Sequence, residues 1–455
     1  MKEFLDFNSA IERKQISGWG RNSFVESKLL NLDSTKQITT FIKGPYVSEL
    51  ITRGLGRSYG DAAQLKEKFV LNVNFSQGIS LSGNQLTVGG GVSISKLLEV
   101  IVPLGYFLPV SPGSAKVTIG GAIAADVHGK NHHNNGSLGN HISRILLIDG
   151  TGDIKELKPS QNHSDKLNNF FWATIGGMGL TGIILEATIS LIKIDTSFMK
   201  VDTFICNEFD ELLKLMKSKD KEYTYSVAWL DSLHKNTRGV LTCGEHAKLQ
   251  DLGEFDSNDL YYDSQNIISA PKFFPSGVLN KFTVKAFNEL WFRKSSKIKN
   301  IQTISQFFHP LDGVDNWNRL YGRQGFYQYQ FVVPDDKTYF ILKTLDKLKK
   351  CSAYSFLTVL KRFGKNNNAF LSFPQKGWTL AVDLPASNFS LLGVLKDLDN
   401  ELASIGGKIY LAKDLRQTSD IFKKTYHLYK EWKNVKSEMD PNNFFQSDLS
   451  KRLKM

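Results

Sequence analysis

Two glycine-rich segments in the N-terminal third constrain the fold of this chain more than any other feature. One is ITRGLGRSYGDAAQ, which begins at Ile51, and the other is SPGSAKVTIGGAIAADVHGKNHHNNGSLGNH, which begins at Ser111. Both interrupt sequence that otherwise reads as β-strands. Glycines and other small residues let a backbone approach an extended anionic ligand, as the diphosphate of a dinucleotide requires. We therefore expect a phosphate-bearing cofactor at these segments.

The first segment is not typical of a nicotinamide-binding turn. Gly54, Gly56 and Gly60 imitate the GxGxxG pattern, but their spacing differs, and that fingerprint expects an acidic residue about 20 positions further on. No Asp or Glu occurs from Phe69 to Leu98. The stretches FVLNVNF and QLTVGGGVSI that follow alternate like strands, whereas a nicotinamide-binding turn would lead into an amphipathic helix.

A cluster of histidines in the second segment raises the question of a metal site. Four of the nine histidines, His128, His132, His133 and His141, fall within a short stretch of glycines and asparagines. No cysteine lies among them and no HExxH pattern occurs, so we expect no metal. For His132, His133 and His141 we expect hydrogen bonds within the loop, and for His128 a place beside the cofactor.

Motifs along nearly the whole chain resemble one family in its own order. They are GLGRSYGD (54–61), VTIGGAIAADVHGKNHH (117–133), GSLGNH (136–141), FWATIGGMGLTGII (171–184), YQYQFVVP (327–334), FLTVLKRFG (356–364), YLAKD (410–414) and DPNNFFQSDLSKRL (440–453). Through them the chain is similar to the vanillyl-alcohol-oxidase-like flavoproteins with a PCMH-type FAD-binding fold. Within that family it resembles the branch that acts on lipid-linked pentoses. The resemblance implies an α+β fold of two domains and FAD as the cofactor.

The pattern of the chain changes near Ile192. Short strands and glycine turns precede it, including a strand, turn and strand in IDGTGDIKEL and a long strand in GLTGIILEATISLIKI. After it, FDELLKLMKSK and TYFILKTLDKLKK have helical spacing, and YSVAWLD, YQYQFVVP and WTLAVDLP read as strands. The resemblance implies an FAD domain over 1–192, a substrate domain over 193–408, and a segment 409–455 that completes a discontinuous FAD domain.

The resemblance also assigns cofactor contacts, mostly to the two glycine segments. Tyr59 occupies a position at which some relatives attach flavin through a histidine, so we expect noncovalent FAD. The expected contacts are Thr52, Arg53, Gly54, Leu55, Gly56, Arg57, Ser58, Tyr59, Gly60, Asp61, Ala62, Gly113, Thr118, Ile119, Gly120, Gly121, Ala125, Asp126, Val127, His128, Ile183 and Tyr410.

Oxidation of an alcohol by flavin needs a substrate C–H over the flavin N5, a group to take the hydroxyl proton, and positive potential for the reduced flavin. The resemblance implies that Lys413 supplies the cation, orienting the hydroxyl and offsetting negative charge. Tyr59 and His128 are the supporting catalytic candidates. From the residues alone, without the resemblance, Lys413 reads as a surface lysine paired with Asp414.

Substrate contacts are expected from the second half of the chain. Gln328 and Gln330 alternate, so in a strand they face the same way and both reach sugar hydroxyls. Lys361 and Arg319 are candidates for phosphate, and Trp229 and Tyr410 for apolar walls; ordinary surface polarity is the alternative for the polar residues. Thr379 and Ala381 stand where mycobacterial relatives carry an asparagine and a cysteine, so sugar contacts and thiol-capturing inhibitors are expected to differ.

Composition narrows the range of partners. The net charge is +12 and the pI about 9.3, but Lys and Arg are dispersed, and no RNP, zinc-finger or helix-turn-helix pattern occurs, so we expect no nucleic acid. Residues 261–300 mix basic and bulky apolar side chains. That mixture suits either a lipid headgroup interface or a surface helix packed on its own domain.

The expected location is the cytoplasm. The N-terminus lacks the apolar core of a signal peptide, no stretch is long enough to span a membrane, and Cys206, Cys243 and Cys351 are scattered. Peripheral contact at the inner face of the membrane is a further expectation.

These features lead to one functional expectation and two alternatives. We expect FAD-dependent oxidation of the C2 hydroxyl of a polyprenyl-phosphate-linked pentose to a ketone, the first half of an epimerisation that a separate NADH-dependent short-chain reductase completes. One alternative is a soluble alditol, aldonolactone or sugar oxidase that produces hydrogen peroxide; the cations Lys361 and Arg319 argue against a neutral substrate. The other is a basic flavin-containing scaffold without catalysis.

Overall fold

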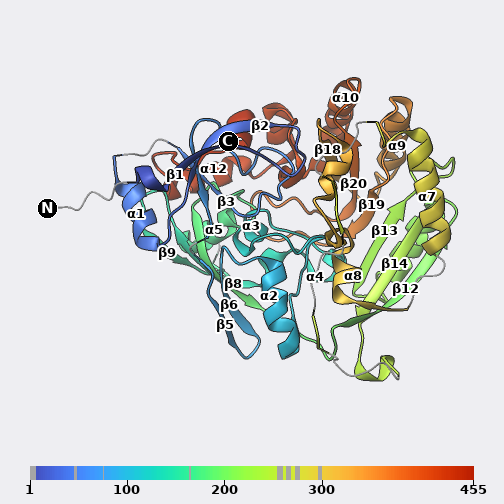
Figure 1. Ribbon diagram of the computed structural model, residues 1–455, viewed down its shortest axis with the longest axis horizontal. Coiled ribbons are helices and arrows are strands. Elements are labelled where there is room, and N and C mark those ends of the chain that lie inside the picture. The colour runs from blue at the N-terminus through green and yellow to red at the C-terminus, as the bar shows by residue number, and fades with distance from the viewer. Residues whose placement is uncertain are drawn as a thin grey trace.

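A computed structural model describes residues 7–45, 49–74, 76–162, 165–253, 260–262, 268–271, 277–295 and 300–455. Its helices and strands form two bodies that lie side by side (Figure 1). One body holds a four-stranded and a five-stranded sheet, and the other holds an eight-stranded sheet. The mixed α+β class expected from the sequence is confirmed.

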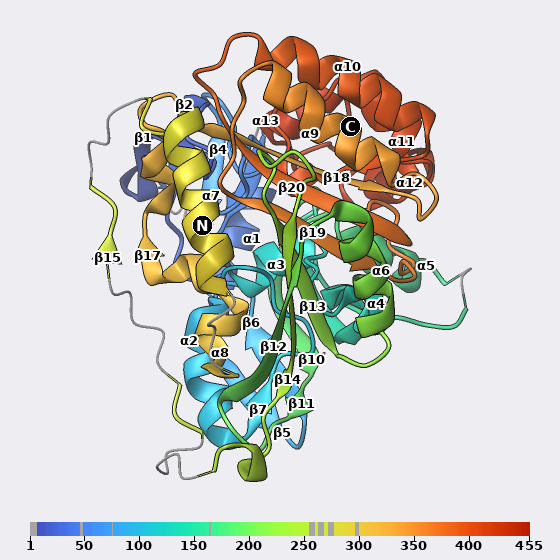
Figure 2. The same cartoon turned by 90° about the vertical axis from the view of Figure 1, so that its right-hand side faces the viewer.

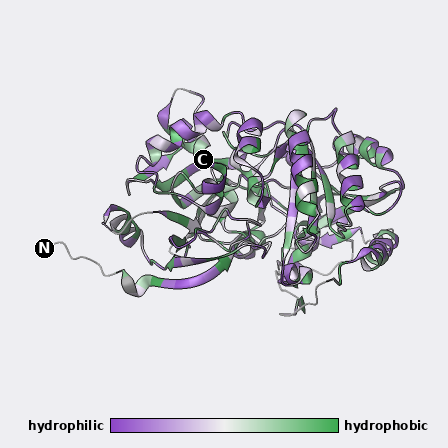
Figure 3. Ribbon diagram, turned by 90° about the horizontal axis from the view of Figure 1, so that it is seen from above, coloured by the Kyte–Doolittle hydropathy of each residue, from purple (hydrophilic) through white to green (hydrophobic). Residues whose placement is uncertain are grey.

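The four-stranded sheet has the order β1 (Ile11–Ser17), β2 (Phe24–Leu30), β4 (Phe69–Asn72) and β3 (Leu50–Arg53). β4 runs parallel to both β2 and β3, which places the first glycine segment directly after β3. β1 lies at the edge, and its residues 12–15 are exposed and hydrophilic (Figure 3). Charged side chains on an edge strand discourage pairing with another molecule.

The five-stranded sheet has the order β5 (Ile79–Ser82), β6 (Gln85–Gly89), β10 (Ile183–Ser190), β8 (Ile142–Ile148) and β9 (Ile154–Leu157). β8 and β9 form the expected hairpin, and Gly152 in its turn has a φ of 77° that only glycine adopts readily. The other elements of this part are α1 (Thr35–Lys43), α2 (Ile94–Ile101), β7 (Tyr106–Phe107), α3 (Ile119–Ala124), α4 (His132–Asn135), α5 (Lys166–Thr174) and β11 (Ile192–Lys193).

The eight-stranded sheet has the order β16 (Ile301–Thr303), β12 (Phe198–Cys206), β14 (Gly239–His246), β13 (Tyr225–Leu230), β19 (Thr358–Phe363), β20 (Gly377–Pro385), β18 (Phe326–Val333) and β21 (Lys408–Ile409). Figure 2 shows this sheet nearly edge-on, with α7 (Lys281–Ser295) on one side and α6 (Phe209–Lys219) on the other. The expected helices at α6 and α9 (Tyr339–Lys350) and the expected strands at β13, β18 and β20 are confirmed. The remaining elements of this part are β15 (Ile268–Ser269), α8 (Ile304–Phe308), β17 (Val314–Asp315) and α10 (Leu391–Ser404).

The C-terminal segment returns to the first body. α11 (Ser419–Thr425), α12 (Tyr429–Met439) and α13 (Asp448–Leu453) follow β21, and the Trp432 indole donates to the Ala173 carbonyl on α5 at 3.0 Å. Leu50 on β3 also pairs with Phe445. The strands change sheet between residues 193 and 198 and again after residue 409. On this pattern we propose the division into 1–192, 193–408 and 409–455.

Within the described residues, no helix combines the length and apolar composition needed to cross a bilayer.

Candidate active site

A cavity of about 630 Å³ lies where the two bodies meet. The glycine segments form one wall, and one face of the eight-stranded sheet forms the opposite wall. Phe287 and Trp291 of α7 contribute to its rim, where they are 44% and 39% exposed. The cavity therefore opens beside α7.

Small residues form the first wall. A Cβ on Gly54 would lie 2.2 Å from the Thr118 Oγ1, so the first glycine loop packs directly on the start of α3. In the described part of the chain, the amides of residues 55–58 donate to no other group, which leaves them free for an anionic ligand. Such a wall fits FAD. The expected cofactor contacts that line the cavity are Thr52, Gly54, Leu55, Gly56, Arg57, Ser58, Tyr59, Ala62, Gly113, Thr118, Gly120, Gly121, Ala125, Val127, His128, Ile183 and Tyr410.

Five expected cofactor contacts do not line the cavity. They lie behind its wall, where they contact other parts of the protein. Arg53 donates to the carbonyls of Ala63 and Ser17, each at 2.8 Å. Asp126 accepts from the Ser137 hydroxyl at 2.9 Å and from the Gly139 amide at 3.0 Å. Ile119 is buried in the core, Asp61 pairs with Arg452, and Gly60 packs on the backbone of Asp414.

The second wall is built by strand alternation. Side chains that point to one face of a sheet recur at every second residue. Gln328 and Gln330 on β18 both line the cavity, as expected, together with Ala381 on β20, Lys361 on β19 and Trp229 on β13. These strands are neighbours in the sheet, so substrate candidates far apart in sequence form one surface.

Two substrate candidates lie outside the lining. Thr379 is buried behind Gln330, whose Nε2 lies 3.4 Å from the Thr379 hydroxyl, and that hydroxyl donates to the Phe331 carbonyl at 2.9 Å. Arg319 donates to the Ala270 carbonyl at 3.1 Å. The structure therefore gives Arg319 a structural contact and does not bring it to the cavity, because its guanidinium turns to the neighbouring loop.

The cavity is strongly cationic. Arg57, Lys130, Lys361 and Lys413 line it, and no Asp or Glu is among the described residues of its wall. Burial lowers the pKa of Lys361 to about 8, and within the described residues its ammonium has no hydrogen-bond or ion-pair partner. An unpaired ammonium in such a site favours an anionic ligand.

Lys413 and Tyr59 face each other. The Lys413 Nζ lies 3.5 Å from the centre of the Tyr59 ring, a distance typical of a cation–π contact. Burial lowers the pKa of Lys413, and Asp383 opposes that shift. Burial also raises the pKa of Tyr59, so the phenol stays protonated. The alternative of a surface lysine paired with Asp414 does not fit the described residues, because Lys413 lines the cavity and Asp414 accepts from Arg452.

His128 lies in the wall beside Lys361. Gln330 donates to its Nε2 at 3.1 Å, and Phe363 and Tyr410 pack on the ring at 4.8 and 5.2 Å. Burial lowers the pKa of His128 well below its ordinary value, with Lys361 adding to the effect. The imidazole is therefore neutral.

The four clustered histidines have separate partners. His132 Nδ1 accepts from the Gly364 amide at 3.2 Å, His133 Nε2 lies 3.2 Å from the Tyr223 carbonyl, and His141 Nε2 lies 2.9 Å from the Asn135 carbonyl. Among the residues that the structure describes, no three His, Cys, Asp or Glu side chains gather as metal ligands.

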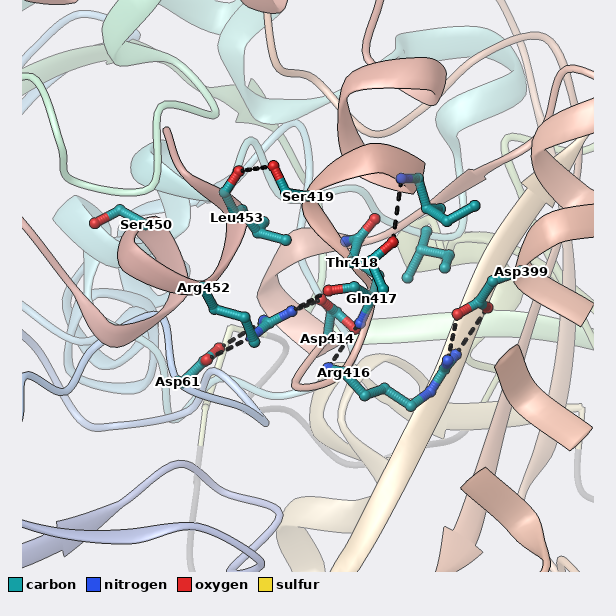
Figure 4. A network of polar contacts seen from close by, with 12 residues as sticks. Asp61, Asp399, Asp414, Arg416, Gln417, Thr418, Ser419, Ser450, Arg452 and Leu453 are labelled. Carbon is teal, nitrogen blue, oxygen red and sulfur yellow. Dashed lines mark hydrogen bonds and ion pairs between the residues drawn. The ribbon is translucent and has the colours of Figure 1, made fainter. Parts of the chain in front are cut away.

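One arginine joins the end of the first glycine motif to the turn that carries Lys413. Arg452 on α13 donates to both carboxylate oxygens of Asp61, at 2.8 and 2.9 Å, and to Asp414 at 2.9 Å (Figure 4). Asp61 ends the first glycine motif, and Asp414 follows Lys413. Burial alone would raise the pKa of Asp414, but Arg452 and Arg416 lower it. The clamp thus fixes the Lys413 turn against the cofactor loop.

Sequence reasoning missed Lys130, Asp383 and Arg452. Lys130 follows the glycine run directly, and its ammonium donates to the Phe308 carbonyl at 3.3 Å. Asp383 stands two residues after Ala381, so strand alternation places both side chains on the same face of the sheet. An acidic residue within an apolar strand is the sequence signal that could have identified it. No local signal in the sequence pointed to Arg452.

Comparison with known proteins agrees with this architecture. Residues 36–158 match a family described as FAD binding domain. Together with the cavity, this match defines a flavoprotein, an FAD-dependent oxidoreductase. Over 454 residues, covering 97% of this chain and 98% of its relative, the sequence is 37% identical to decaprenylphosphoryl-beta-D-ribose oxidase of Mycolicibacterium smegmatis. This chain belongs to the family of that oxidase.

Two further relatives are more distant. An uncharacterized Streptomyces coelicolor protein from the mprA 5' region is 30% identical over 80% of this chain and 100% of its own length. The FAD-linked oxidoreductase tazG of Aspergillus terreus is 26% identical over 25% of this chain and 22% of its own.

Proposed function

We propose that this chain oxidises the C2 hydroxyl of a polyprenyl-phosphate-linked pentose to a ketone. The observation that carries the proposal is the Lys361 ammonium, which lies in the cavity wall on the same sheet face as Gln328 and Gln330. Among the described residues, this ammonium has no hydrogen-bond or ion-pair partner and the wall has no carboxylate. An ammonium suits the phosphate, and the two amides suit sugar hydroxyls. The name of the mycobacterial relative supports the same substrate class.

The residues divide the work of this reaction. FAD, when bound, would supply the acceptor for the hydride that leaves the substrate carbon. Lys413 orients the hydroxyl and offsets the negative charge that develops. Gln328 and Gln330 bind the sugar, and the neutral His128 imidazole takes the proton of the substrate hydroxyl. Tyr59 completes the wall beside it.

The test compares substrates under anaerobic conditions. Polyprenyl-phosphoryl ribose should bleach the flavin absorbance, whereas free pentoses and alditols should bleach it far more slowly at the same concentration. Equal bleaching by alditols, with hydrogen peroxide formed in air, would favour the alternative of a soluble sugar oxidase.

We propose that the ketone passes to a separate NADH-dependent reductase, which would complete a 2-epimerisation. The test mixes the chain and such a reductase with polyprenyl-phosphoryl ribose and follows the sugar by mass spectrometry and NMR. Ketone should accumulate without the reductase, and arabinose configuration should appear with it. A ribose product alone would contradict the epimerisation.

We also propose that α7 contacts the inner face of the membrane, where a polyprenyl substrate resides. Its inward face buries Val284 and Asn288, whereas Phe282 and Leu290 are 84% and 70% exposed. Lys285 lies exposed on the same helix. Exposed apolar residues among lysines suit an anionic lipid surface. Of the basic and apolar residues noted in this region, Lys272, Phe273, Phe274, Lys297 and Lys299 lie outside the described residues.

Co-sedimentation with vesicles tests this contact. The protein should bind vesicles that contain phosphatidylglycerol, and a Phe282→Ser, Leu290→Ser double variant should bind less. Leu392→Ser on α10, where Leu392 is 47% exposed, is the matched control and should bind like the parent. Equal vesicle binding by the parent, the double variant and the control would show that α7 does not contact the membrane.

A further inference from the structure

A single row of cross-strand partners crosses the sheet wall of the cavity. Its members, in order from β18 to β14, are Gln330, Ala381, Val359, Trp229 and Val240, and all of them line the cavity. Neighbouring strands lie about 4.8 Å apart, so the row spans about 19 Å. It begins with an amide and continues with apolar side chains. The chemistry of the wall therefore changes from polar to apolar across the sheet.

Lys361 lies between these two parts of the wall. It follows Val359 by two residues on β19, so both side chains point to the same face of the sheet. Strand β18, which carries Gln328 and Gln330, lies on one side of β19, and strands β13 and β14 lie on the other. A phosphate bound by Lys361 therefore has sugar-binding amides on one side and apolar strands on the other.

The β13–β14 hairpin forms the apolar end of the wall. The residues that alternate toward the cavity along its two strands are Val227, Trp229, Val240 and Thr242. Both strands are described in full, and none of their residues that line the cavity is charged. A hydrocarbon chain on this surface would leave water without displacing the hydration of an ion.

Aromatic side chains of α7 form the opposite side of the apolar end. Phe287, Trp291 and Ser295 are spaced four residues apart, so they form one stripe of the helix, and all three line the cavity. The Phe287 ring lies 5.5 Å from the ring of Phe356, which also lines the cavity. The Trp229 indole donates to the Phe356 carbonyl at 3.0 Å. The hairpin and α7 therefore meet at Phe356.

The turn of the hairpin holds α7 in place. Asn288, on the buried side of α7, donates to Oδ1 of Asp231, the residue that follows β13, at 2.8 Å. Arg238, directly before β14, donates to Asp231 at 3.0 Å, and its guanidinium lies 4.0 Å from the centre of the Phe292 ring. Contacts outside the cavity therefore fix the position of α7 relative to the hairpin.

We propose that the apolar end and α7 together bind the isoprene units that lie next to the phosphate of a prenyl phosphate. This inference rests on the proposed function, because it takes the phosphate to lie at Lys361. From β19 to β14 the wall extends by about 10 Å, a length of about two isoprene units. Later units leave past the rim residues Phe287 and Trp291. The enzyme therefore recognises the first units of the chain and not its full length.

The first test varies the chain of the substrate. Methyl-, geranyl- and farnesylphosphoryl ribose differ in the number of isoprene units, and flavin reduction gives the KM of each. The KM should fall by at least about 30-fold from the methyl to the geranyl compound, and by less than about fivefold from geranyl to farnesyl. Equal KM values for the methyl and geranyl compounds would overturn the inference and leave the proposed oxidation standing.

A charge placed in the apolar end tests its position. Thr242→Asp should reduce the KM ratio of methyl- to farnesylphosphoryl ribose to about threefold or less, because the carboxylate would lose water to the chain. Thr203→Asp is the matched control, since Thr203 on β12 pairs with Thr242 but is not among the described residues that line the cavity. The control should keep the parental ratio. A parental ratio in Thr242→Asp would contradict the inference.

A second variant keeps this test decisive if Thr242→Asp does not fold. Trp291→Ala removes a side chain that is 39% exposed, and it should lower the same KM ratio by about fivefold. Tyr339→Ala on α9, where Tyr339 is 52% exposed and outside the described cavity lining, should keep the parental ratio. An unchanged ratio in Trp291→Ala would exclude α7 from the site.

Binding without turnover separates this inference from the proposed function. By calorimetry, farnesyl phosphate should bind the FAD-loaded protein at least about 30-fold more tightly than methyl phosphate, and Thr242→Asp should remove most of that difference. Equal affinities would overturn the inference. If the difference is found but farnesylphosphoryl ribose does not reduce the flavin, the prenyl site stands and the proposed function is refuted.

Discussion

Gly60 and Asp414 touch through their backbones: a Cβ added to Gly60 would lie 1.9 Å from the Asp414 carbonyl oxygen. No rotamer change relieves a contact with backbone. Gly60→Ala should therefore separate the cofactor loop from the Lys413 turn and cost about 1–3 kcal/mol of unfolding free energy. Chemical denaturation and FAD retention on a desalting column measure the effect. Gly78→Ala, where an added Cβ meets nothing within 4 Å, should change neither.

The cofactor should be released intact. The family resemblance places Tyr59 where some relatives carry a histidine that attaches flavin, and tyrosine cannot form that histidyl bond. Acid or heat denaturation of the yellow protein should leave free FAD in the supernatant, identified by chromatography. Flavin that stays with the precipitated protein would show a covalent link elsewhere.

Loss of the Lys361 charge should discriminate between substrates. Lys361→Gln should weaken a phosphorylated substrate by about 1.5–3 kcal/mol, the range for a charged hydrogen bond, and affect unphosphorylated sugars much less. Titration of flavin absorbance gives both affinities. Arg319→Gln is the control, because Arg319 lies outside the cavity lining, and its effect should be small. Equal losses for both substrate classes would point to a neutral sugar.

Removal of the Lys413 side chain should separate binding from chemistry. Lys413→Ala should retain FAD, because the glycine wall holds most of the cofactor, while the rate of flavin reduction falls by about 10² or more. Rapid mixing with saturating substrate measures this rate. Lys424→Ala, on the exposed side of α11, should behave like the parent. A near-parental rate in Lys413→Ala would make Lys413 structural.

Buried neutral histidines should make the fold acid-sensitive. Burial lowers the pKa of His132 and His309 to about 3 and that of His246 to about 4. Below the unfolded value of about 6.5 the unfolded chain binds protons that the folded chain does not, so stability falls as pH drops from 6.5 toward 4. In urea titrations at stepped pH, His309→Gln should reduce that slope by about 1.4 kcal/mol per pH unit. An unaltered slope would mean that His309 does not set it.

The sequence predicts the parts of this molecule that depend on local pattern. Strand alternation placed Gln328 and Gln330 on one face, and helical spacing marked α6 and α9. Local pattern does not predict contacts between segments that are distant in the sequence. The sequence suggests Arg319 as a phosphate ligand, whereas in the structure its guanidinium donates to the Ala270 carbonyl. The sequence suggests Asp126 as a cofactor contact, whereas its carboxylate accepts from the Ser137 hydroxyl. Family motifs supplied the role of Lys413, which its local sequence does not distinguish from a surface lysine.

The Arg452 clamp bears on how the site assembles. Every described residue of the cavity wall precedes Asp414, yet the bond between Arg452 and Asp61 spans 391 positions of the chain. Contacts of such separation form late, because a long loop must close before they contribute. A folding intermediate can thus contain every described residue of the cavity wall before the Arg452 contacts fix their relative positions. A fusion partner or a protease site placed at α13 should therefore abolish turnover while the protein remains folded by spectroscopic measures.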